Sequence, residues 1–62
     1  MFEKLMKEID YAKNSVFPNR SLYHVYGKIK MARELEVITT DEFMELNHEC
    51  VYKGINNPKY FD

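Results

Sequence analysis

The sequence has 62 residues, of which 45% are hydrophobic and 31% are charged, values typical of a soluble globular chain. A chain this short forms one small domain with a thin stability margin, which excludes a two-domain enzyme, a nucleotide-binding βαβ pair and a large enclosed active site. Nine basic and ten acidic residues give a formal net charge of −1, so the overall charge gives no reason to expect a polyanionic partner.

Targeting signals and membrane spans are not expected. No apolar run approaches the ~20 residues of a transmembrane helix, and Glu3 and Lys4 stand where a signal peptide has its apolar segment. Cys50 is the only cysteine, so no intramolecular disulfide can form. We therefore expect a cytoplasmic protein, with residues 1–62 as a single helical domain and no membrane contact.

The first predicted helix covers about residues 2–16. Its apolar side chains recur mostly at spacings of three and four, as on one face of an amphipathic helix. They are Phe2, Leu5, Met6, Ile9, Ala12 and Val16. Pro18 disfavours a helical conformation at the residue before it, so the helix should end there. Residues 18–21 read as a turn, with Asn19 or Ser21 as the next helix cap.

The second predicted helix covers about residues 20–36 and has its own apolar face. That face consists of Leu22, Val25, Ile29, Ala32 and Leu35. Gly27 lies within this helix at a cost of about 1 kcal/mol relative to alanine. It marks either a notch where another helix backbone approaches closely or a position that simply tolerates glycine.

The third predicted helix covers about residues 40–53. Thr39 and Glu42 have the spacing of a capping box, and the core face holds Phe43, Leu46 and Cys50. Gly54 is expected just past the helix end. Residues 55–62 form a non-helical tail, which is either flexible, an interaction peptide, or packed back on the helices. The fold class is therefore all-α, a small three-helix domain with short antiparallel connections.

Residues 35–46 (LEVITTDEFMEL) resemble the turn of short helical hairpins of the SHOCT type. In that turn a helix ends, an Ile-Thr pair crosses, and an acidic-Phe segment starts the next helix. Glu36 stands where the family usually has a glycine. The whole chain, with its ending GINNPKYF, is similar to very short uncharacterised helical proteins of Gram-positive bacteria and their phages. That resemblance implies an accessory protein or inhibitor that acts on a host protein.

Charge is segregated along the chain. Residues 19–33 hold the bases Arg20, Lys28, Lys30 and Arg33 and no acid, whereas residues 34–49 hold six acids and no base. Facing surface charges between the two helices are one interpretation; an acidic face that docks on a basic partner is the other. Residues 31–37 resemble the first half of a helix-turn-helix, but the acids of the third helix would repel DNA. Nucleic-acid binding through the basic second helix remains the alternative function.

Enzymatic and metal chemistry lack the residues they need. His48 and Cys50 point in different directions on a helix, and Cys50 lies on the core face. A zinc site needs three or four ligands, and the chain offers one cysteine and two histidines that nothing requires to meet, since His24 and His48 are on different predicted helices. Glu45 with His48 forms a single E-x-x-H pattern, and a dimer would have to supply the second copy that a di-iron site uses. We expect no catalytic residue, no cofactor and no metal.

Recognition by surface contact is the function that remains. The chain has five tyrosines and four phenylalanines, and several tyrosines, together with Met31 and Met44, fall off the apolar faces. Tyrosine and methionine both suit interfaces. We expect a non-enzymatic protein–protein interaction module, with homodimerisation as one source of stability. The expected partner-binding residues are Asp41, Glu42, Glu45, Glu49, Tyr23, Tyr52 and Tyr60.

Overall fold

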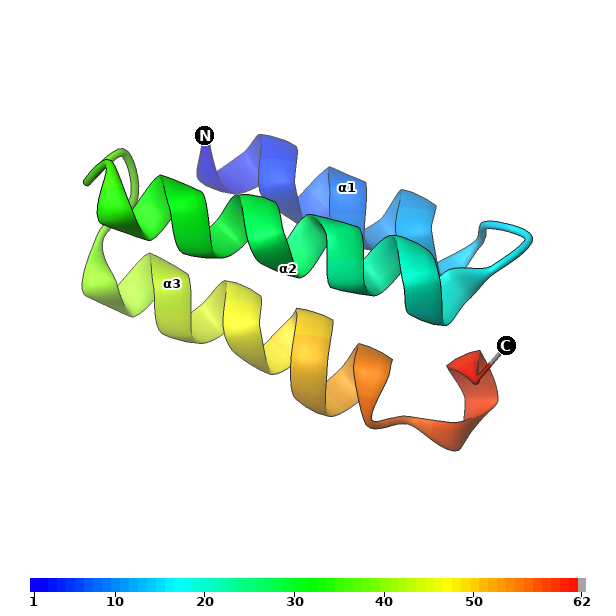
Figure 1. The fold of residues 1–62 in the computed structure, drawn as a ribbon. Coiled ribbons are helices and arrows are strands. Elements are labelled where there is room, and N and C mark those ends of the chain that lie inside the picture. The colour runs from blue at the N-terminus through cyan, green and yellow to red at the C-terminus, as the bar shows by residue number, and fades with distance from the viewer. Residues whose placement is uncertain (62) are drawn as a thin grey trace.

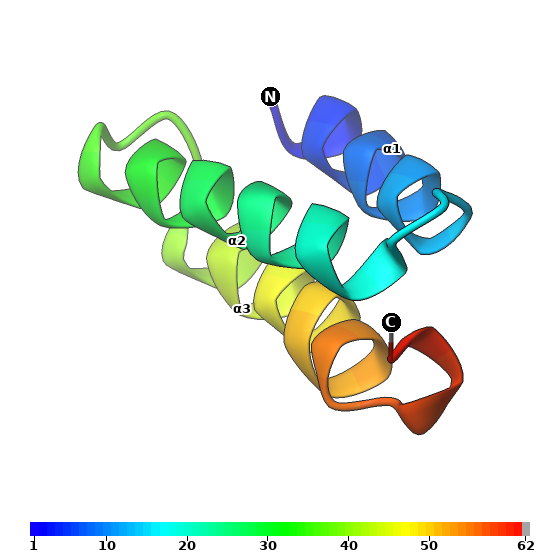
Figure 2. The ribbon, with the colours of Figure 1, turned by 45° about the vertical axis from the view of Figure 1, so that its right-hand side comes forward.

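Three helices lie side by side and alternate in direction (Figure 1), in a computed structural model that describes residues 1–61. The elements in chain order are α1 (Phe2–Lys13), α2 (Pro18–Glu34), α3 (Thr40–Asn47), the π-helix η1 (His48–Ile55) and the 3-10 turn η2 (Pro58–Tyr60). Because η1 continues α3 directly, the two segments make one third helix. The turned view in Figure 2 shows α2 beside both α1 and α3, and α1 also contacts the third helix, so the three helices surround a common centre. The predicted all-α, three-helix class is confirmed.

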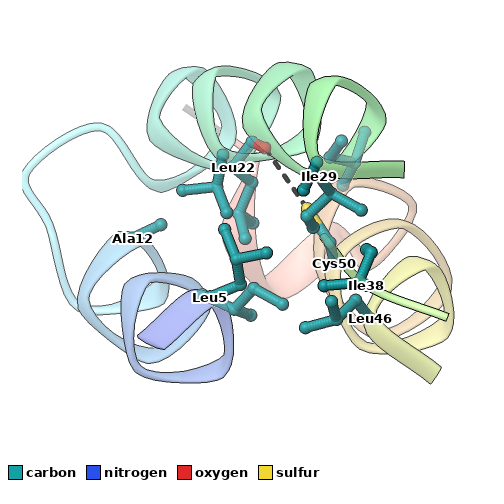
Figure 3. Packing of buried hydrophobic residues seen from close by; sticks show 11 residues of the cluster. Leu5, Ala12, Leu22, Ile29, Ile38, Leu46 and Cys50 are labelled. Carbon is teal, nitrogen blue, oxygen red and sulfur yellow. Dashed lines mark hydrogen bonds between the residues drawn. The ribbon is translucent and has the colours of Figure 1, made fainter. Parts of the chain in front are cut away.

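A single apolar core lies between the three helices (Figure 3). Its buried members are Leu5, Ile9, Ala12, Leu22, Val25, Ile29, Ala32, Ile38, Leu46, Cys50 and Ile55. Most positions of the three predicted apolar faces are therefore confirmed. Two are wrong, because Val16 is 87% exposed and Leu35 is 66% exposed. Both lie just beyond the end of a helix.

The first helix ends at Lys13, three residues earlier than predicted. The Asn14 side chain donates to the carbonyl oxygen of Asp10 at 2.9 Å, and the Ser15 hydroxyl donates to that of Ala12 at 2.8 Å. The same two carbonyls also accept the backbone amides of Asn14 and Ser15, each at 3.2 Å, so the side chains add a second hydrogen bond at each carbonyl of the last turn. Val16 consequently lies in the connecting loop and points to solvent.

The second helix begins at Pro18, not near residue 20. Proline suits the first position of a helix, because its fixed φ angle is helical and its missing N–H would have no partner there. Neither predicted cap is used, since Phe17 occupies the N-cap position. Gly27 has no atom within 4 Å of the place a β-carbon would take, so the close-approach interpretation is wrong.

The end of α2 is a Schellman motif, in which two amides beyond the helix bond back to carbonyls of its last turn. The Val37 amide donates to the carbonyl oxygen of Ala32 at 3.0 Å, and the Glu36 amide donates to that of Arg33 at 3.1 Å. Glu36 takes the left-handed conformation that this motif requires, with φ of 57°. The helix thus ends at Glu34, two residues before the predicted end.

Replacing Glu36 by glycine should raise the free energy of unfolding by about 1 kcal/mol, because only glycine adopts positive φ without a steric penalty. Urea denaturation measures the change. Glu34→Gly is the matched control, since the same substitution two residues earlier falls inside the helix and should destabilise by a similar amount. Loss of stability in both variants would contradict the assignment of strain to Glu36.

The third helix starts with the predicted capping box. The Glu42 amide donates to the Thr39 hydroxyl at 3.1 Å, and the Thr39 amide donates to the Glu42 carboxylate at 2.8 Å. Both bonds satisfy amides that the first helical turn leaves without intrahelical partners. Thr39 and Glu42 therefore fix the start of α3 at the predicted residue.

The second half of the third helix is a π-helix, which the apolar spacing did not predict. In an α-helix Ile55 would lie about 140° around the axis from Cys50 and face away from the core. The wider π turn, with its i→i+5 hydrogen bonds, buries Cys50, Gly54 and Ile55 together. Gly54 is not a residue past the helix end: it is buried, it lacks positive φ, and a β-carbon there would lie 3.0 Å from Leu22 Cδ1.

The chain beyond η1 folds back toward the loop between α1 and α2 (Figures 1 and 2). Asn57 accepts a hydrogen bond from the Lys59 amide at 3.0 Å, and this bond supports the short turn η2. Tyr60 is half-buried and packs against the core. The interpretation of the tail as a segment packed on the helices is thus confirmed as far as Tyr60, and Asp62 lies outside the described residues.

Candidate functional site

An exposed stripe of side chains runs along the outer side of α3 and into η1. We call Asp41, Met44, Glu45, His48 and Tyr52 the α3 stripe; all five are exposed. Their spacing of three and four residues places them on one helix face, and the rings of His48 and Tyr52 lie 5.7 Å apart between centroids. The stripe combines two acids with two large apolar side chains, which suits contact with another protein.

Only two of the four predicted binding acids belong to this stripe. Asp41 and Glu45 have no side-chain partner among residues 1–61. Glu42 is engaged in the capping box. Glu49 lies 3.0 Å from the Lys53 ammonium and 3.5 Å from that of Lys13, and the hydrogen bond from Lys53 lowers the pKa of its carboxyl. Glu42 and Glu49 therefore have structural contacts within the chain.

The three predicted tyrosines lie in different places. Tyr52 belongs to the α3 stripe. Tyr23 is exposed on α2 and lines a shallow depression with Ile55 and Phe61. Tyr60 is half-buried, and the Lys13 ammonium lies 5.9 Å from its ring centroid. The structure thus separates the predicted tyrosines and does not bring them into one site.

A groove between α1 and α2 is the feature that sequence reasoning missed. Near the N-terminus it has a volume of about 370 Å³. Exposed apolar side chains form its walls, and buried core residues form its floor. The walls are Met1, Met31, Leu35 and Val37, and the floor is Leu5 and Ala32. Such a recessed apolar surface is a typical place for a partner side chain or helix.

The groove continues along the same two helices toward the α1–α2 loop. This second part has a larger volume, about 500 Å³, and its lining includes Tyr11, Ser15, Arg20 and His24. An ion pair marks the junction, because Lys28 and Glu8 border both parts and their charged atoms lie 2.6 Å apart. The two parts together form the α1/α2 groove, which no α3 residue lines.

The bases of the second helix are spread over several contacts. Lys28 pairs with Glu8 of α1 rather than with an acid of α3, and the Arg33 guanidinium donates to the Thr40 hydroxyl at 2.7 Å. Lys30 lies over the Tyr26 ring, 5.6 Å from its centroid. Of the described ion pairs, one joins α1 to α2, one joins α1 to η1 and one lies within η1. None of these pairs joins a base of the second helix to an acid of the third, so the predicted attraction between facing charges of those two helices is not the pattern found.

The chemistry-bearing side chains do not assemble around a common point. Cys50 is fully buried, its thiol donates to the carbonyl oxygen of Leu22 at 3.3 Å, and burial raises its pKa to about 11. A thiol held protonated in the core is a poor nucleophile. Glu45 and His48 are both exposed, and within residues 1–61 no three His, Cys, Asp or Glu side chains come close enough to hold a metal ion.

Comparison of the chain with protein-family models, curated proteins and solved structures gave no match. The resemblance to SHOCT-type hairpins and to short phage proteins thus stays a prediction. In the described part of the chain, none of the helices has the length and apolarity needed to cross a bilayer. The candidate binding surfaces of the chain are therefore the α3 stripe and the α1/α2 groove.

Proposed function

We propose that this chain is a non-enzymatic protein-binding module of the cytoplasm, and that it contacts its partner through the α3 stripe. The observation that carries the proposal is the pairing of Asp41 and Glu45, which have no internal partner among residues 1–61, with exposed Met44 and Tyr52. A partner with an apolar surface rimmed by bases would complement this arrangement.

The charge reversals Asp41→Lys and Glu45→Lys, made together, should abolish capture of the partner from a lysate of the source organism. Both side chains are exposed, so the fold should persist with a loss of about 1 kcal/mol or less from the changed charge at the start of α3. Captured proteins are identified by mass spectrometry, and circular dichroism confirms the helices.

Glu3→Lys with Glu34→Lys is the control, because it makes the same change in net charge at exposed acids outside the stripe. This control should bind as the native chain does. An unchanged set of captured proteins with the stripe reversed would overturn the proposal. A second result would also overturn the proposal: a mobility shift of DNA or RNA that weakens with salt and is lost in the variant Lys28→Glu with Lys30→Glu. This result would assign the function to the basic second helix.

A further inference from the structure

The α1/α2 groove has a definite charge as well as an apolar lining. Its lining holds the bases Lys4, Arg20 and Lys28 and the acid Glu8; Lys28 and Glu8 pair with each other, so the lining keeps an excess of two positive charges, from Lys4 and Arg20. Its apolar walls include Met31, which is 54% exposed. An occupant should therefore be apolar along its centre and acidic at its edge.

The α3 stripe of this same chain has the chemistry that such an occupant needs. Met44 and Tyr52 supply apolar contact area, and Asp41 and Glu45 supply carboxylates that no described side chain neutralises. The lengths also agree. From Asp41 to Tyr52 the stripe extends about 16 Å, and the twelve residues of α1 extend about 18 Å along the groove.

We propose that the α3 stripe of one copy docks in the α1/α2 groove of a second copy. This inference rests on the proposed protein-binding function and names its partner as this chain itself. Leu46 and Cys50 of the third helix are buried in the core and the stripe residues are exposed, so the stripe lies on the outer side of that helix, whereas no residue of α3 or η1 lines the groove. The stripe and the groove are therefore separate surfaces of one molecule. Contact is therefore head-to-tail, and each added copy presents a further open groove and a further open stripe.

Symmetric alternatives are disfavoured by charge. Two grooves placed face to face would bring Lys4, Arg20 and Lys28 of both copies together, and two stripes would oppose their carboxylates. Like charges at close range reduce affinity. The asymmetric pairing brings opposite charges together and covers both exposed apolar surfaces.

A mixing experiment distinguishes these arrangements. Met44→Lys with Glu45→Lys disables the stripe and leaves the groove intact, whereas Lys4→Glu with Met31→Glu disables the groove and leaves the stripe intact. All four side chains are exposed, so both variants should fold. By sedimentation velocity the native chain should grow in mass with concentration. Each variant alone should be monomeric, and their equimolar mixture should form a dimer of twice 7.5 kDa and nothing larger.

Lys7→Glu with Tyr23→Glu is the matched control, because it replaces one lysine and one exposed apolar residue outside both surfaces. It should associate as the native chain does. Raising the salt concentration from about 0.05 M to about 0.5 M should weaken association about tenfold or more, since the charges that attract lie at the rim. A native chain that is monomeric at every concentration, or a mixture that stays monomeric, overturns this inference. Stripe-dependent capture of a different protein by a monomeric chain would overturn it while leaving the proposed function intact.

Discussion

Replacing Leu22 by alanine should lower the free energy of unfolding by about 2–5 kcal/mol, the usual cost of a fully buried leucine. Leu22 has no exposed surface and lies between α1 and the third helix (Figure 3). A chain of this length has a total stability of about 3–9 kcal/mol. The substitution should therefore bring the domain close to unfolding at room temperature, as urea denaturation followed by circular dichroism will measure.

The loss of stability caused by Leu22→Ala should change when Gly54 is also replaced by alanine, because Gly54 packs closely against Leu22. A β-carbon at Gly54 would lie 3.0 Å from Leu22 Cδ1 and 3.2 Å from Cδ2, so Gly54→Ala alone should crowd the core. Shortening Leu22 to alanine removes both of these methyl groups and leaves the Glu49 carbonyl oxygen, at 3.3 Å, as the nearest remaining atom. Gly54→Ala should consequently destabilise the native chain and stabilise the Leu22→Ala variant, with a coupling energy of about 1–3 kcal/mol.

Gly27→Ala provides the control for this cycle. Gly27 is exposed and has open space around it, so alanine should add about 1 kcal/mol of stability whatever occupies position 22. If the effects of Gly54→Ala and Leu22→Ala simply add, the contact between η1 and α2 is looser than described.

Local chemistry made much of the fold predictable. The capping box at Thr39 requires only two residues three apart, and the structure contains both of its hydrogen bonds. The apolar spacing identified the core positions within each helix because burial repeats with the helical period. Helix ends were less predictable, since the last turn of α1 is closed by local backbone and side-chain bonds of Asn14 and Ser15 that the apolar spacing does not report. The error at Val16 follows directly from that early stop.

The π-helix had no local signal. Cys50 and Ile55 are five residues apart, a spacing that an α-helix does not place on one face, and only packing against α2 makes their joint burial favourable. Gly54 looked like a residue past a helix end because glycine is frequent there. Its actual role is close contact with Leu22, which depends on residues 32 positions apart in the chain.

The α3 stripe could be predicted from the sequence of one segment, whereas the α1/α2 groove could not. Asp41 and Glu45 were identified from the charge of one segment, and the structure leaves both exposed. Predicting the groove requires knowing that α1 and α2 lie side by side. Its wall residue Leu35 continues the apolar spacing of the second helix, and the sequence therefore predicts it to be in the core. The Schellman turn at Glu36 ends that period, and Leu35 becomes part of the groove wall.

The buried thiol of Cys50 predicts a specific loss of stability in alkaline solution. Burial raises its pKa from 9.0 to about 11 in the folded chain. Below pH 9 the thiol is protonated in both the folded and the unfolded state, and it makes no pH-dependent contribution. Between pH 9 and 11 only the unfolded chain releases the proton, which favours unfolding by about 1.4 kcal/mol per pH unit. The total loss should be about 3 kcal/mol, and no further loss from this group should occur above pH 11.

Cys50→Ser isolates this effect from that of other groups. Serine does not titrate in this range, and its hydroxyl retains a donor for the carbonyl oxygen of Leu22 that the thiol now bonds at 3.3 Å. The two proteins differ only at position 50, so the difference between their urea-denaturation curves reports Cys50. The native chain should lose its stability advantage over Cys50→Ser as the pH rises from 9 to 11. Parallel pH profiles would mean that the thiol reaches solvent in the folded chain, and that the contact between η1 and α2 opens readily.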